Sequence, residues 1–253
     1  MIIRLFFAAI LAGVISGVVI SLVYQFSTVP LILRAEVFEA NRAHSGESSP
    51  KLQSTSFNIS HTNNGKTATI YIHDNKNDKN LSKDKSKNNI ERIIYTSITT
   101  ILTGIGFALL LVSGMAIRGD PVNFRVGILW GVAGFSAFTL APALGLPPEL
   151  PGMAAGDLPV RQTWWITTIL LTILALWTLI FSQKISFRII AIILLVAPHV
   201  VGAPEPEILS ANTLPPELAA KFASVSIGVS ALFWALLGGL SAYFFDRFNK
   251  KAI

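Results

Sequence analysis

Six uncharged apolar stretches constrain the fold of this sequence more than any other feature. Each runs for about 15 to 25 residues without a Lys, Arg, Asp or Glu. A helix needs about 20 apolar residues to cross roughly 30 Å of membrane hydrocarbon. The sequence therefore predicts an all-α, polytopic membrane helix bundle. The predicted spans are 5–25, 93–117, 126–146, 163–182, 189–203 and 222–245.

The fifth stretch is the shortest and contains Pro198 and His199, so it can be a crossing or a re-entrant element. The basic residues bear on this question. Lys and Arg concentrate after the second and fourth stretches and at the C-terminus, whereas the alternate short connections carry only Arg161 and Lys221. Cytoplasmic loops are enriched in Lys and Arg. This alternation predicts that both termini are cytoplasmic, and it requires the fifth stretch to cross.

The spans divide the chain into three parts. The first stretch lacks a small-x-small cleavage pattern, so we expect an uncleaved helix rather than a secretory signal. The predicted parts are a first transmembrane helix at 1–33, an extracytoplasmic, polar and largely disordered loop at 34–92, and a five-span bundle at 93–253 with Pro-rich outer loops at 141–162 and 197–221.

The segment 47–89 is rich in Ser, Asn, Lys and Asp and poor in apolar residues. Such a composition buries too little apolar surface to offset the entropy of ordering. A weak alternation at 67–73 permits one strand. His44, His61 and His73 lie in or beside this segment without the close spacing of a metal site, so we expect them to be solvated.

A phrase that nearly repeats marks the outer ends of two spans. Each span breaks at Ala-Pro, with the prolines at 142 and 198, and each break leads into Leu-Pro-Pro-Glu-Leu, at 146–150 and 214–218. Proline lacks a backbone N–H and clashes with the preceding turn, so the helix must kink or end. Non-helical backbone at membrane depth requires surrounding protein or a watery cavity. The two matched breaks therefore predict two halves of one cavity.

Candidate metal ligands cluster at these breaks. Of all the His, Asp, Glu, Lys and Arg residues, only His199 falls within the six stretches. Neutral imidazole suits cobalt, nickel and zinc, which ligand type alone does not distinguish. If the breaks pack together, this histidine and nearby carboxylates form a mixed nitrogen and oxygen site for an incoming cation. The candidate metal ligands are His199, Glu205, Glu207, Glu149, Asp157 and Glu217.

Each candidate also has a structural interpretation. A loop carbonyl can satisfy the imidazole of His199. Glu149 and Glu217 follow proline pairs and can cap helices or turns, since acids are favourable at helix N-termini. Asp157 and Arg161 are four residues apart, which is the spacing of an ordinary ion pair on a helix. These alternatives remain open from the residues alone.

Two further patterns concern packing. Small residues recur every four positions in three spans, a spacing that lets helix backbones approach closely in lipid. Trp164 and Trp165 begin the fourth span, where indoles commonly anchor a helix at the interface. The small residues are Ala9, Gly13, Gly17 and Ser21, then Gly127 and Gly131, then Ala231, Ala235 and Gly239.

Several function classes are excluded. The sequence Gly65-Lys66-Thr67 ends like a phosphate-binding loop, but Ser60 stands where the first glycine belongs. No nucleotide-binding fingerprint, nucleophile elbow or His-Glu-x-x-His motif occurs, so we expect neither an enzyme nor a nucleotide-binding protein. There is no cysteine, which excludes thiolate metal ligands. The net charge of +6 largely reflects topology, so we expect membrane lipids and not nucleic acid as partners.

Three phrases, at 141–153, 157–165 and 198–207, resemble CbtA, a bacterial family of proposed cobalt transporter components. The resemblance covers most of the chain except roughly 42–89. It implies an integral inner-membrane protein linked to cobalt supply for cobalamin synthesis, usually paired with a small one-span, His-rich subunit. Family members commonly carry a short, often His-bearing segment after the first span, whereas this chain has a long Asn/Lys-rich insert.

Three functional hypotheses follow. The leading one is a component of a divalent metal uptake system, with cobalt as transported substrate and no resident cofactor. The second is a non-transporting membrane scaffold, favoured by the absence of charges in the spans and of an energy-coupling motif. The third is a membrane enzyme with a site in the outer loops, using Asp157, Arg161 and Glu207.

Overall fold

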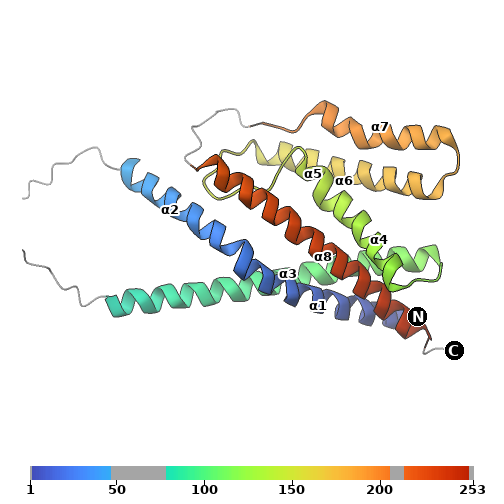
Figure 1. Ribbon diagram of the computed structural model, residues 1–253, viewed down its shortest axis with the longest axis horizontal. Coiled ribbons are helices and arrows are strands. Elements are labelled where there is room, and N and C mark those ends of the chain that lie inside the picture. The colour runs from blue at the N-terminus through green and yellow to red at the C-terminus, as the bar shows by residue number, and fades with distance from the viewer. Residues whose placement is uncertain (1, 47–77, 206–213, 251–253) are drawn as a thin grey trace, which may run out of the picture.

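The computed structural model describes residues 2–46, 78–205 and 214–250, and every regular element in this part of the chain is a helix (Figure 1). The predicted all-α class is therefore confirmed. The elements are α1 Ile2–Ser27, α2 Val29–Gly46, α3 Asp78–Arg118, α4 Phe124–Phe135, the π-helical turn η1 Ser136–Leu140, α5 Ala141–Ala143, α6 Leu158–Phe181, α7 Ile185–Val201 and α8 Pro216–Lys250.

Five helices in the described part are long and apolar enough to cross a membrane. They correspond to five of the six predicted spans, and α4, η1 and α5 together form one of them. These candidate spans are Ile2–Ser27, Ile90–Arg118, Phe124–Ala143, Leu158–Phe181 and Pro216–Lys250.

The remaining predicted span is α7, an apolar helix of 17 residues. It runs back along α6 (Figure 1). At 1.5 Å per residue α7 is about 25 Å long, near the lower limit for a crossing. Moreover, α1 begins and α8 ends at the same end of the bundle (Figure 1). A chain with both ends on one side must cross the membrane an even number of times. The geometry therefore favours a crossing over a re-entrant element.

The helices extend into the segment for which the sequence predicted a largely disordered loop. Helix α2 continues to Gly46 and α3 begins at Asp78, so residues 34–46 and 78–92 are helical and differ from that expectation. An ion pair between Arg92 of α3 and Glu36 of α2 joins the two extensions. The strand proposed at 67–73, with His61 and His73, lies outside the described residues.

Burial explains why α2 is ordered. Its apolar residues Leu31 and Ala35 pack against Leu150, Leu214 and Phe222, which come from three later parts of the chain. All five are buried, with at most 8% of each residue exposed. This long-range burial offsets the entropy of ordering in a way that local composition does not reveal.

Small residues set the close packing of the bundle, as predicted. A Cβ atom on Gly13 of α1 would lie 2.5 Å from the backbone of Ile105 in α3, closer than real atoms approach. In α8 the contact differs from the predicted pattern. Gly238 of α8 packs against the backbones of Gly127 and Gly131 in α4, whereas Ala231 and Ala235 are only partly buried. Helices in lipid associate through such close backbone contacts.

Candidate functional site

The first proline break ends the third span in two stages. Because Pro142 has no N–H, the hydrogen-bond ladder widens before it, and Ala141 donates its N–H to Ser136 O across the π-helical turn η1. The helix then ends at Ala143, and Leu146 donates its N–H to Pro142 O at 2.8 Å. The sequence therefore predicted the location of this break, and the widened turn accommodates the proline.

The second of these helices, α7, ends three residues later than the predicted break at Pro198. Pro198 does not end the helix at once, and α7 continues to Val201. The chain then leaves the helix at Gly202, where φ is 85°, a left-handed conformation that glycine adopts without steric cost. The N–H of Gly202 donates to Pro198 O at 3.1 Å.

The stretches of chain that follow Pro142 and Pro198, called here the two break segments, lie against each other at the same end of the bundle. A Cβ atom on Gly145, after the first break, would lie 2.9 Å from Cβ of Ala203, after the second. Farther along, a Cβ on Gly156 would lie 3.1 Å from the backbone oxygen of Glu205. Leu150 and Leu214, one from each Leu-Pro-Pro-Glu-Leu copy, also belong to one buried cluster.

Trp164 joins the two segments. Its Nε1–H donates to Pro198 O at 3.1 Å, and its ring contacts His199 edge-on with centroids 6.0 Å apart. A Cβ on Gly145 would lie 2.5 Å from the same indole. Trp164 is only 9% exposed, whereas Trp165 is 40% exposed. Only Trp165 has the exposed placement expected of both indoles, because adjacent helical residues point in different directions.

Arg161 forms its ion pair with Glu149 and not with Asp157. Its Nη2 donates to Glu149 Oε2 at 2.6 Å, and both side chains are about three-quarters buried. The alternative interpretation of Asp157, an ion pair with Arg161, is therefore not what the structure shows. Glu149 lies in the loop after α5 with its carboxylate on Arg161, so helix capping does not describe its contacts. Asp157 immediately precedes α6, is exposed, and makes no side-chain capping bond.

A double-mutant cycle tests this ion pair. We expect Glu149→Gln and Arg161→Gln to show a coupling free energy of about 1 kcal/mol in thermal unfolding, because the pair is shielded from water. The matched cycle of Asp157→Asn with Arg161→Gln should show coupling near zero. Equal coupling in the two cycles would contradict the assigned pairing.

The remaining candidate ligands are distributed along the same end of the bundle. His199 is half-buried beside Trp164, and Glu205 is exposed at the contact with Gly156. Glu217 is exposed in the first turn of α8, which is a favourable helical position for an acid. Within the described residues no three His, Asp or Glu side chains form a group able to hold a metal ion. Glu207 lies outside them.

The sequence did not indicate two of the side-chain roles at this end. These roles are the contacts of Trp164 with both break segments and the ion pair of Arg161 with Glu149. Both depend on which loops contact each other in the folded protein. A weak signal for the first was present, since two adjacent indoles on one helix cannot both face the interface. The ion pair had no signal, because twelve residues with a loop separate its members.

Helices of membrane-spanning length and two Pro-broken segments at one end define a multi-pass α-helical membrane protein. A family model described as "Probable cobalt transporter subunit (CbtA)" matches residues 2–246, nearly the whole chain. The chain therefore belongs to this cobalt transporter subunit family. The word subunit implies a system of more than one component. No curated protein and no solved structure matches the chain.

Proposed function

We propose that this chain is the inner-membrane component through which Co²⁺ enters the cell, and that the ion first binds between the two break segments. The observation that supports the proposal is the direct contact of these segments through Gly145, Ala203, Gly156 and Glu205. Irregular backbone at the end of two apolar helices offers free carbonyl oxygens, and such broken helices commonly line substrate sites in transporters.

Three candidate ligands suit the ion best. Asp157 follows Gly156, whose backbone packs against Glu205, so these two carboxylates come from adjoining stretches of backbone. His199 precedes Glu205 on the second break segment and provides an imidazole nitrogen. Imidazole and carboxylate donors of this kind suit Co²⁺ and its neighbours Ni²⁺ and Zn²⁺. Glu207 is two residues further along the chain than Glu205, outside the described residues, and stays a candidate from the sequence alone.

The other two acids have secondary roles in this proposal. Glu149 is neutralised by Arg161, so it holds the first loop in place and contributes less to attracting the ion. Glu217 adds negative charge to the outer end from the first turn of α8. Negative charge around an entrance raises the local concentration of a cation and the rate at which it binds.

Cobalt uptake by cells tests the ligand assignment. We expect His199→Ala, Asp157→Asn and Glu205→Gln each to lower the initial uptake rate at limiting Co²⁺ by about tenfold, because a lost ligand weakens binding of the arriving ion. Glu91→Gln removes an exposed acid from α3 and serves as the control. Membrane abundance of every variant is measured in parallel. Unchanged uptake in all three variants would exclude these residues from the mechanism.

A non-transporting scaffold is the second candidate function. One observation favours it: the fully buried hydroxyls of Thr168 and Thr172 in α6 donate to carbonyls of their own helix, so these two groups are not free to contact an ion. Purified protein in liposomes distinguishes the two functions. Co²⁺ flux down a gradient through the chain alone would exclude the scaffold.

A partner is part of the proposal. We infer that a small one-span, His-rich membrane protein delivers Co²⁺ to the outer end. If so, adding it to the liposomes should raise flux at low Co²⁺, and the two chains should copurify. Flux that is identical with and without such a partner would remove it from the pathway.

A further inference from the structure

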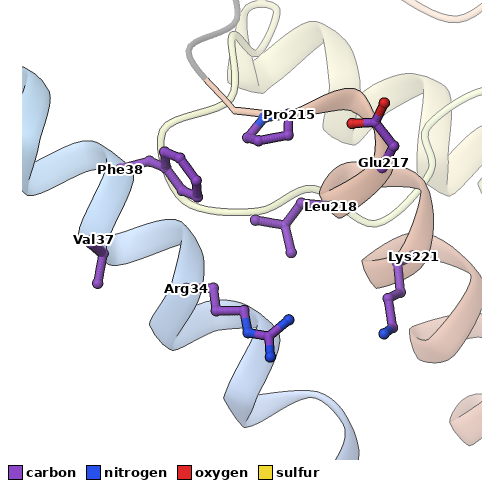
Figure 2. Close-up of a pocket in the computed structure, with 7 residues that line it drawn as sticks. All are labelled: Arg34, Val37, Phe38, Pro215, Glu217, Leu218 and Lys221. Carbon is purple, nitrogen blue, oxygen red and sulfur yellow. The ribbon is translucent and has the colours of Figure 1, made fainter.

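A groove of about 510 Å³ separates α2 from the beginning of α8 (Figure 2). Helix α2 contributes Arg34 and Phe38 to its lining, and Leu218 and Lys221 come from α8. The groove is open on one side and lies outside the contact between the two break segments. Its depth in the membrane follows from Lys221, which immediately precedes the uncharged run that begins at Phe222. The groove is therefore at the outer rim of the bilayer.

Two cations, Arg34 and Lys221, line this groove together with one acid, Glu217, and no ion pair joins them among the residues that the structure describes. Arg34 and Lys221 both extend toward the space between the helices, as Figure 2 shows, and neither forms a described ion pair. The neighbouring acids are directed elsewhere. Glu36 pairs with Arg92, and the carboxylate of Glu217 points away from the two cations.

Except for Glu217, the rest of the lining is apolar. Phe38, Pro215 and Leu218 form one side of the groove, opposite the two charged side chains (Figure 2). Beneath them lies the buried cluster that contains Leu31 and Phe222. The groove thus combines a pair of cations with an apolar wall, at the depth where phosphate headgroups meet acyl chains.

We propose that this groove binds an anionic phospholipid of the outer leaflet. Its phosphate would lie between Arg34 and Lys221, and an acyl chain would lie along Phe38 and Leu218. One shared anion relieves the repulsion between two nearby cations and forms charge-assisted hydrogen bonds with both. A soluble anion would leave the apolar wall uncovered, and an uncharged lipid would leave the cations unpaired. The site would tie α2 to α8.

Lipid binding to the purified full-length chain tests the proposal. Native mass spectrometry would measure binding of phosphatidylglycerol and of phosphatidylcholine with the same acyl chains. Each basic residue near a membrane surface contributes a factor of about five in affinity for anionic lipid. We therefore expect Arg34→Gln and Lys221→Gln each to weaken phosphatidylglycerol binding about fivefold, and the double variant to weaken it about 30-fold. Phosphatidylcholine binding should not change.

Matched variants separate the effect of charge on lipid binding from an effect on folding. A competition experiment separates the contribution of the headgroup from that of the acyl chain. Lys184→Gln removes an exposed cation at the opposite end of the bundle and should leave lipid binding unchanged. Arg34→Lys with Lys221→Arg keeps both charges and should retain the preference. Equal binding of the two lipids by the unaltered chain would overturn the proposal, as would an unchanged preference in the double variant. Glycerophosphate that competes as well as the whole lipid would overturn the acyl contact.

Discussion

Replacing Trp164 by alanine is expected to destabilise the outer end of the bundle by about 3–5 kcal/mol and to abolish cobalt uptake. The indole is buried, fills the space beside Gly145, and holds the second break through its bond to Pro198 O. Truncation to alanine removes a large side chain that both break segments contact, and the cavity left behind adds to the cost. Thermal unfolding in detergent and initial uptake rates measure the two effects.

The neighbouring indole provides the matched control. Trp165→Ala removes the same side chain from the same helix at a 40% exposed position, so we expect a change in unfolding free energy below about 1 kcal/mol. Trp164→Phe keeps a ring but loses the donor to Pro198 O, which should cost about 0.5–1.5 kcal/mol. If Trp164→Ala and Trp165→Ala behaved alike, the bridging role of Trp164 would be wrong.

Gly238→Ala should have the second largest effect, although it adds only one methyl group. The new Cβ would lie 2.7 Å from the amide nitrogen of Gly131 and still closer to Gly127 O. Helices α4 and α8 must separate to admit it, and rigid backbone cannot yield as a side chain can. We expect a loss of at least about 1–3 kcal/mol in unfolding free energy and a lower yield of folded protein.

Gly228→Ala tests the same chemical change on the same helix. A Cβ at Gly228 meets nothing within 4 Å, so its substitution should be neutral or slightly stabilising, since alanine favours helix over glycine. The difference in melting temperature between the two variants isolates the close approach of α4 and α8. A Gly238→Ala protein as stable as Gly228→Ala would show that these helices are not in such tight contact.

Much of this fold could be predicted from sequence because its signals are local. An uncharged run of about 20 residues predicts a span wherever it occurs, and a proline breaks a helix through its own missing N–H. Five of the six predicted spans correspond to helices of sufficient length, and α7 supplies the sixth as a shorter helix. The small residues of α1 and α4 likewise lie at helix contacts.

The candidate site was harder to predict. Its breaks could be located at Pro142 and Pro198, but the metal ligands remain predictions, because the described residues bring no three of them together. The partner of Arg161 was not predicted: helical spacing offered Asp157 as one alternative, whereas the fold brings Glu149 to Arg161. Helical spacing considers only residues that are close along the chain. It does not include a side chain such as Glu149, which a loop brings close to Arg161 in the folded protein.

The sequence by itself determined the membrane class, the approximate bounds of the apolar helices and the approximate positions of the two breaks, since each depends on a continuous run of side chains. Only the tertiary structure decided that the breaks touch, that Trp164 joins them, that α2 is ordered, and that Arg34 and Lys221 line one groove. These features depend on segments far apart in the chain, and their contacts follow from how whole helices pack.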